Sequence, residues 1–93
     1  MKVKIKSFGH IRSIMKSPVV TVTVKDNATA KDVIDAFIND FPEVKKLLFH
    51  DGKIHSYYTL VDNDNNDIEN DKLEKKRVSE NDLIKIIPFI GGG

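Results

Sequence analysis

Apolar and polar residues alternate near the start of the chain, a pattern typical of half-buried strands. Residues 2–8 place Val3 and Ile5 on one face and three lysines on the other. Residues 19–24 are rich in β-branched side chains, with valines on one face and threonines on the other. We expect these two strands to form a hairpin, with residues 9–18 as a long turn between them.

Helical periodicity follows in residues 30–41, where apolar residues recur every three or four positions. The apolar positions are Ala30, Val33, Ile34, Phe37, Ile38 and Phe41. Thr29 and Asp32 have the spacing of a capping box, which predicts that the helix begins there. Pro42 interrupts the pattern, and residues 43–48 are expected to add a further turn or two of helix.

The second half of the chain contains two further strand patterns. Asp51-Gly52 indicates a turn, and residues 57–61 are expected to form a third strand. Residues 62–71 are polar and acidic, which predicts a loop. Isolated apolar residues are expected to anchor this loop and the segment after it to the core, namely Ile68, Leu73 and Val78.

The final strand is predicted at residues 83–88, after a turn in which Asn81 takes a positive φ. Ile84 and Ile86 then share one face of this strand. The order of one main helix among about four strands indicates the α+β class, with the helix packed across one face of a mixed sheet.

Composition bounds the chemistry of the chain. Its 93 residues form one small domain, and a formal net charge of +1 gives no bulk electrostatic case for a nucleic-acid partner. The chain has no cysteine, which excludes disulfides, thiolate nucleophiles and iron–sulfur ligation and fits a cytoplasmic protein. No apolar run approaches the length of a membrane span, so we expect no membrane partner.

Candidate metal sites fail on spacing. Counted from Asp62, an EF-hand loop needs glycine and glutamate where the chain has Asp67 and Leu73. The histidines, at positions 10, 50 and 55, lack a ligand spacing. We therefore expect no metal. The basic stripe at Lys2, Lys4 and Lys6 and the run at residues 75–77 are interpreted as solvated faces.

The last residues, Ile90-Gly91-Gly92-Gly93, follow the final strand directly. Gly93 carries the main-chain carboxylate, and glycines without Cβ atoms fit a narrow site on another protein. Our hypothesis is that the α-carboxylate of Gly93 is the functional group, presented by Gly91 and Gly92.

The element order and the segment from Ile87-Pro88 to Gly92-Gly93 resemble the ubiquitin-like sulfur-carrier proteins. This family includes the small subunit of molybdopterin synthase, the thiamine-pathway sulfur carrier and the archaeal small modifiers. The resemblance implies a β-grasp fold with a four- to five-stranded mixed sheet. Residues 1–90 would form the β-grasp domain, and residues 91–93 a flexible C-terminal glycine tail.

The resemblance also implies a chemistry. An ATP-dependent, ubiquitin-activating-type enzyme would adenylate the Gly93 carboxylate, and sulfur would then convert it to a thiocarboxylate for molybdopterin, thiamine or tRNA thiolation. The chain would be a protein co-substrate rather than an enzyme and would bind no cofactor itself, since ATP is used by the partner. A second partner would be the large subunit of molybdopterin synthase or another sulfur acceptor.

Two alternatives remain open at this point. The same activation could end in isopeptide bonds to lysines, or the chain could be a β-grasp interaction module whose tail has no chemistry. The partner is expected to contact the sheet face away from the helix, near Ile87, Pro88, Phe89 and Ile90. The competing interpretation is that Phe89 folds back over a sheet edge.

Overall fold

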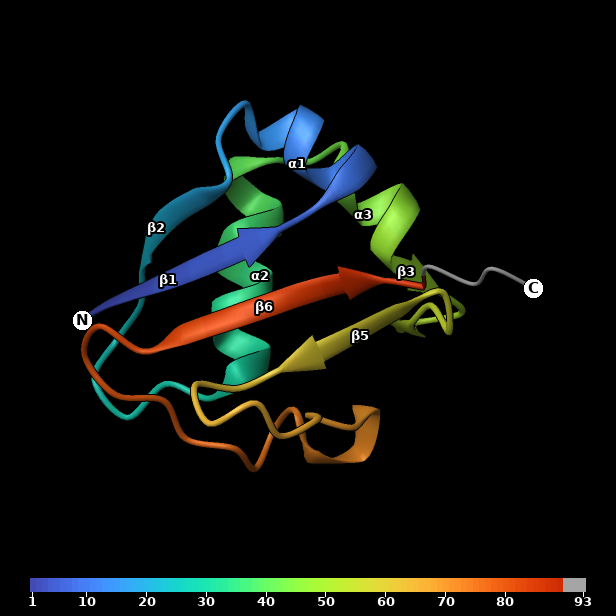
Figure 1. The fold of residues 1–93 in the computed structure, drawn as a ribbon. Coiled ribbons are helices and arrows are strands. Elements are labelled where there is room, and N and C mark those ends of the chain that lie inside the picture. The colour runs from blue at the N-terminus through green and yellow to red at the C-terminus, as the bar shows by residue number, and fades with distance from the viewer. Residues whose placement is uncertain (90–93) are drawn as a thin grey trace.

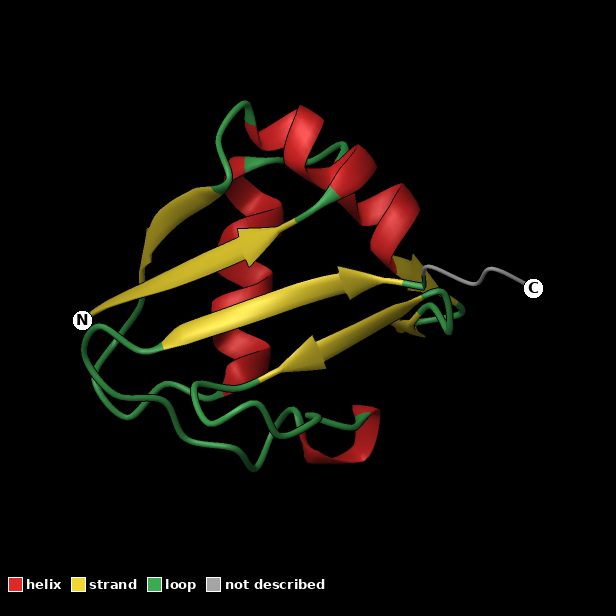
Figure 2. Ribbon diagram, in the orientation of Figure 1, coloured by secondary structure: helices red, strands yellow, loops and turns green. Residues whose placement is uncertain are grey.

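The computed structural model describes residues 1–89 and shows a sheet with helices packed on one of its faces (Figure 1). Figure 2 separates the helices from the strands by colour. The elements in chain order are β1 (Lys2–Ser7), α1 (Gly9–Met15), β2 (Val19–Thr23), α2 (Ala30–Asp40), α3 (Val44–Leu48), β3 (Phe49–His50), β4 (Lys53–Ile54), β5 (Tyr58–Val61), the 3₁₀ helix η1 (Asn70–Lys72) and β6 (Leu83–Pro88).

The main sheet has four strands in the order β2-β1-β6-β5. β1 pairs antiparallel with β2 and parallel with β6, and β6 pairs antiparallel with β5. The sheet faces the viewer in Figure 1, with α2 behind it. The predicted α+β class, the mixed sheet, the β1–β2 hairpin and the last strand are therefore confirmed.

The core lies between the sheet and α2. Every second residue of the strands points inward, and the apolar face of α2 covers them. The sheet contributes Val3, Ile5, Val22, Leu60, Ile84 and Ile86, and α2 contributes Ala30, Val33, Ile34 and Phe37, all buried. Ser7 is also buried, and its hydroxyl donates to the carbonyl of Ile86 at 2.9 Å, so no polar atom is left without a partner there.

The expectation of a long turn at residues 9–18 was wrong, because Gly9–Met15 forms helix α1. Ile11 and Met15 of this helix are buried, at the spacing of four residues that places them on one face. A helix of seven residues is not stable alone, so α1 depends on this tertiary packing. Lys16 ends it in the left-handed conformation, with φ 59°.

A small hairpin was also missing from the predicted elements. β3 and β4 pair antiparallel around the expected Asp51-Gly52 turn, with φ values of 52° and 77°. Positive φ at both central residues is the two-residue hairpin turn that matches strand twist.

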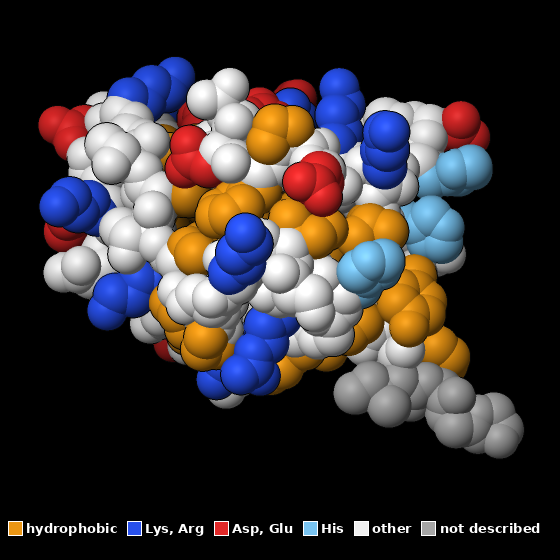
Figure 3. All heavy atoms as spheres, turned by 90° about the horizontal axis from the view of Figure 1, so that it is seen from above, with side chains coloured by type: hydrophobic (Ala, Val, Ile, Leu, Met, Phe, Trp, Pro, Cys, Tyr) orange, Lys and Arg blue, Asp and Glu red, His pale blue; other side chains and the backbone are white. Residues whose placement is uncertain are grey.

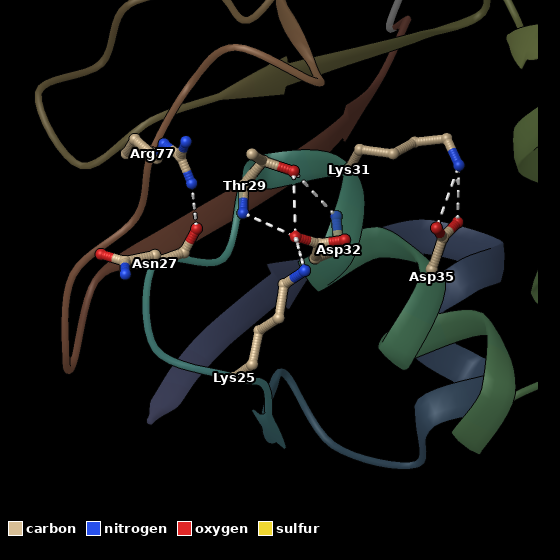
Figure 4. A network of polar contacts seen from close by, with 7 residues as sticks. All are labelled: Lys25, Asn27, Thr29, Lys31, Asp32, Asp35 and Arg77. Atoms are coloured by element: carbon tan, nitrogen blue, oxygen red, sulfur yellow. Dashed lines mark hydrogen bonds and ion pairs between the residues drawn. The ribbon is translucent and has the colours of Figure 1, made fainter.

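The N-terminus of α2 forms the predicted capping box (Figure 4). The Thr29 hydroxyl accepts from the backbone N–H of Asp32 at 3.3 Å, and the Asp32 carboxylate accepts from the backbone N–H of Thr29 at 2.9 Å. The hydrogen bond from the Thr29 backbone lowers the pKa of Asp32, and the nearby Lys25 and Lys31 act in the same direction.

The next N–H groups of α2 are satisfied by a distant segment. Ala30 donates to the carbonyl of Lys76 at 2.8 Å, and Lys31 donates to that of Leu73 at 2.9 Å. The side chain of Arg77 donates to the carbonyl of Asn27 in the same network (Figure 4). Ile68, Leu73 and Val78 are buried, as predicted, so the connection from β5 to β6 is attached both to the core and to the helix.

We expect Asp32→Ala to lower the free energy of unfolding by about 1 kcal/mol, because it removes one half of the capping box. Urea denaturation at neutral pH measures this. The control is Asp35→Ala, since Asp35 only pairs with Lys31 on the helix surface, where such pairs contribute about 0.2–0.5 kcal/mol. Equal losses in the two variants would contradict the assigned role of Asp32.

The pH dependence gives a second test of the same contact. The pKa of Asp32 is lower in the folded chain, so its contribution is present above the ordinary aspartate pKa of about 3.9 and is lost as pH falls through the folded value. We expect Asp32→Asn to show a smaller loss of stability than wild type between about pH 5 and pH 2. Identical acid profiles would contradict this.

Candidate functional site

β6 leads the chain out of the middle of the sheet. It lies between β1 and β5, and its register pairs Ile84 with Ile5 and Ile87 with Thr59. Pairing with β1 ends at Ile86, so the last residues of β6 bond only to the β5 side. The backbone N–H of Phe89 donates to the carbonyl of Tyr57 at 2.6 Å and extends this ladder beyond Pro88. The position of Phe89 is thus fixed by the sheet.

Apolar and aromatic side chains surround this point on the sheet face away from α2. The backbone hydrogen bond to Phe89 brings Tyr57 next to it at the edge of the sheet, where the Tyr57 ring lies 5.1 Å from that of Tyr58. Tyr57 and Phe89 are both exposed, with 47% and 67% of their surface accessible. Ile87 is half-buried on the same face. Phe8 follows β1 and, with the register continued by one residue, lies beside Ile87. We name these four residues, Phe8, Tyr57, Ile87 and Phe89, the exit surface.

The exit surface is a suitable place for a protein contact. Exposed aromatic residues contribute large contact areas at low entropic cost, and tyrosine is enriched among residues that dominate binding energies. Two of the three large apolar side chains that are exposed within residues 1–89 belong to this surface. The partner contact predicted for Ile87 and Phe89 stays a prediction, but both lie on the face that the alternation indicates.

The remaining predicted site residues are Pro88, which lies on the other side of the sheet, and Ile90 to Gly93, which follow the described part of the chain. Pro88 points to the opposite side of the sheet, where its Cγ lies 3.9 Å from the position that a Cβ on Gly9 would take. Gly9 has a φ of 60°, so glycine suits the start of α1 next to this ring. The predicted contact at Ile90 and the functional roles of Gly91, Gly92 and Gly93 lie outside the described residues.

Sequence reasoning missed two members of the exit surface. Tyr57 was assigned only to a strand, and Phe8 was not singled out. The alternation in residues 2–8 already placed Phe8 on the lysine face. The register of β5 against β6 was the missing information for Tyr57, because only tertiary pairing brings it opposite Phe89.

The Asn/Asp-rich loop folds against the same face at some distance from Phe89. Asn63 accepts from the backbone N–H of Leu83 at 3.2 Å, and Asn65 accepts from Nζ of Lys85 at 3.1 Å. Asp62 is buried, and one carboxylate oxygen accepts the backbone N–H groups of Asp64 and Asn66, both at 2.9 Å. The loop therefore covers part of β6 and has a structural role.

The pKa of Asp62 is lowered, chiefly by the hydrogen bond from the backbone of Asn66. Its second carboxylate oxygen lies 3.3 Å from Nζ of Lys76. Both oxygens of this carboxylate thus already have donors from the protein. Nowhere in residues 1–89 do three or more metal-ligating side chains gather in a group that could hold an ion.

The histidines show one close pair. The rings of His50 and His55 lie 5.6 Å apart, and Nδ1 of His55 accepts from the backbone N–H of Tyr57 at 2.9 Å. The bond fixes the turn that precedes β5.

Within residues 1–89, each helix is too short or too polar to cross a membrane.

A hollow lies on the helical side, between α1 and α3. It has a volume of about 480 Å³ and is lined by His10, Ile14, Pro42, Glu43, Lys46 and Leu47. Figure 3, which views the molecule from this end, shows hydrophobic side chains gathered across it between charged ones. No residue of the exit surface lines this hollow.

The arrangement of four strands around one main helix, with the last strand in the middle, is the β-grasp fold. Solved structures share it over the whole chain. Small archaeal modifier protein 1 (SAMP1) from Haloferax volcanii superposes with a TM-score of 0.83 at 23% identity, covering 100% of both chains. No protein-family model matches the sequence, and no curated protein matches it either.

Two other solved structures have the same fold. CysO of Amycolatopsis orientalis, solved in a complex with BexX, gives a TM-score of 0.80 at 22% identity, covering 98% of this chain and 99% of that one. A putative molybdopterin converting factor subunit 1 from Pyrococcus furiosus gives 0.76 at 18% identity, with 97% and 99% covered. The predicted β-grasp fold is thereby confirmed.

Side-chain truncation at Phe89, compared with truncation at a buried residue of β6, distinguishes the exposed from the folded-back interpretation of Phe89. We expect Phe89→Ala to change the free energy of unfolding by less than about 0.5 kcal/mol, because its ring is mostly exposed. Ile86→Ala, three residues earlier and fully buried, should cost about 2–5 kcal/mol. Chemical denaturation measures both. A loss above about 1 kcal/mol for Phe89→Ala would mean that the ring packs on the sheet.

Proposed function

We propose that the chain is a sulfur-carrier protein whose Gly93 carboxylate is adenylated and then converted to a thiocarboxylate. The observation that carries this proposal is the position of Phe89, which the sheet fixes beside an exposed aromatic surface. Four residues separate it from the end of Gly93. Fully extended, they reach about 13 Å, enough to enter a partner's active site while the sheet docks outside.

The chemistry proceeds in two balanced steps. A carboxylate oxygen of Gly93 attacks the α-phosphorus of ATP, and pyrophosphate leaves, which gives an acyl-adenylate. Hydrosulfide, or a sulfur nucleophile of the same class, then attacks the acyl carbon. The bond between this carbon and the phosphate oxygen breaks, and AMP leaves with the electron pair. The product is a main-chain thiocarboxylate. Activation is needed because a carboxylate offers no good leaving group.

The composition supports a role as co-substrate. The chain contains no cysteine, so it has no thiol on which sulfur could be carried. In this proposal the main-chain carboxylate of Gly93 holds the sulfur instead. The side chains near Phe89 are aromatic or aliphatic, suited to contact rather than to proton transfer. The adenylating enzyme supplies the ATP site in this proposal.

The similarity to two of the solved structures supports the partner classes. CysO occurs in a complex with BexX, and the P. furiosus protein is described as a subunit of a converting factor. We therefore propose two partners in sequence: an ATP-dependent adenylating enzyme, and an acceptor such as the large subunit of molybdopterin synthase.

A second candidate function is favoured by the similarity to SAMP1, which is described as a modifier. In this function the acyl-adenylate is formed in the same way, but the amine of a lysine on a target protein finally takes the acyl group. The docking surface and the use of Gly93 are common to both functions.

Intact-mass spectrometry distinguishes these functions. The chain is incubated with the adenylating enzyme of its source organism, ATP and sulfide, and we expect a mass gain equal to one sulfur replacing one oxygen. A variant lacking Gly93 is the control and should gain nothing. High-mass lysine adducts in cell extract without the sulfur exchange would instead establish the modifier. If neither product forms, both functions are wrong.

A further inference from the structure

The sheet face that carries the exit surface is strongly cationic. The outward positions of its strands are Lys2, Lys4 and Lys6 on β1, Val19, Thr21 and Thr23 on β2, Thr59 and Val61 on β5, and Leu83, Lys85 and Ile87 on β6. Four of these eleven residues are lysines, and none is acidic. The chain as a whole carries a net charge of only +1, so the strand residues of this face are more basic than the chain on average, while the Asn/Asp-rich loop lies beside Lys85.

The register places two of these lysines side by side. Lys6 on β1 lies directly opposite Lys85 on β6, and neighbouring strands are about 4.8 Å apart. Like charges directly opposite each other on a sheet are destabilising. Lys4 extends the same row on β1. We name Lys4, Lys6 and Lys85 the lysine stripe.

The structure does not neutralise the stripe. The ion pairs formed within residues 1–89 involve none of its members. Nζ of Lys6 lies 5.6 Å from the ring centroid of Phe8, and Nζ of Lys85 donates to the amide oxygen of Asn65. Both partners are neutral. Glu80 accepts from the backbone N–H of Lys2, at the end of β1 farthest from Phe8.

The exit surface is also too small to form a stable interface alone. A standard protein interface buries about 800 Å² on each partner, against a total accessible surface of 5856 Å² for the chain. Four residues do not supply this area, so a protein that binds there extends onto the neighbouring strands. Lys6 and Lys85 are the next residues on β1 and β6, since they come two positions before Phe8 and Ile87.

We infer that the lysine stripe is the electrostatic half of the docking surface, and that the adenylating enzyme covers it with an acidic patch next to an apolar pocket for the exit surface. This inference rests on the proposed function. Opposite charges across an interface speed association and fix orientation. Here they would align the sheet so that the chain beyond Phe89 points toward the ATP site.

An acidic protein surface fits the face better than nucleic acid does. Nucleic-acid-binding domains are usually basic as a whole, with a pI above about 9, whereas this sequence has a pI near 8.0. Half-buried Ile87 and Leu83 lie among the lysines and need an apolar partner to leave water.

The test is the kinetics of adenylation, followed by ATP–pyrophosphate exchange with the adenylating enzyme as the chain concentration varies. We expect the double variant Lys4→Glu/Lys6→Glu to raise KM for the chain about tenfold, with kcat nearly unchanged. The matched control is Lys45→Glu/Lys75→Glu, which makes the same charge change away from the sheet and should alter KM less than twofold. A rise in ionic strength from about 0.01 M to 1 M should raise the wild-type KM and should affect the stripe variant less.

A stability measurement separates docking from folding. Lys6→Glu places a carboxylate opposite Lys85, so its melting temperature should equal or exceed that of wild type although its KM rises. A lower melting temperature that accounts for the higher KM would overturn the inference.

The remaining outcomes are distinct. If wild type is adenylated but the stripe and control variants share one KM, the stripe inference fails and the proposed function stands. If wild type is not adenylated at all, both fail. If a labelled single-stranded RNA binds wild type, and the stripe variant loses this binding while keeping its KM, the partner is nucleic acid and the inference is overturned.

Discussion

The parallel pairing of β1 with β6 is the contact on which the rest of the structure depends. It joins the first strand of the chain to the last and places β6 between β1 and β5. The register from Lys4–Leu83 to Ser7–Ile86 decides at once which residues face α2 and which face solvent. A shift by one residue would move Ile84 and Ile86 out of the core and Lys85 into it. The buried hydrogen bond from the Ser7 hydroxyl to the Ile86 carbonyl depends on this register, because the register pairs Ser7 with Ile86.

A long connection joins β5 to β6, although their antiparallel pairing already brings Val61 at the end of β5 opposite Lys85 near the start of β6. That connection, residues 62–82, has little regular structure beyond η1, yet its apolar side chains are buried. The connection is attached to α2 through the first backbone N–H groups of the helix, because Ala30 and Lys31 donate to the carbonyls of residues 76 and 73. The helix end and the loop satisfy each other's backbone groups, and neither needs a strand for this purpose.

Local patterns were sufficient to predict much of this fold. Alternation predicted β1, β2, β5 and β6, and periodicity with the Thr29–Asp32 spacing predicted α2 and its cap. Helix α1 was missed because its apolar residues, Ile11, Ile14 and Met15, cover barely two turns and become helical only when Ile11 and Met15 pack in the core. The exit surface was predicted in part. Ile87 lies in β6 and Phe89 follows that strand directly, whereas Tyr57 joins them only through the pairing of β5 with β6 and the hydrogen bond that extends it.

The interpretation of Lys2, Lys4 and Lys6 as a solvated face followed from their alternation alone, and it omitted what lies on the next strand. A lysine beside water costs nothing by itself, but two facing lysines on neighbouring strands repel each other. The sequence could have avoided this with one carboxylate at Lys85, which would pair with Lys6 across β1 and β6. Instead the strands carry no acidic residue on that face, and the aromatic rings gather at its end. This face is less favourable for folding, and it is continuous with exposed Tyr57 and Phe89. Natural sequences depart from locally optimal choices mainly at functional sites. Both features are therefore expected of a surface that contacts a partner. In the proposed function, the sheet holds the end of β6 in place, and the face around it contacts the partner.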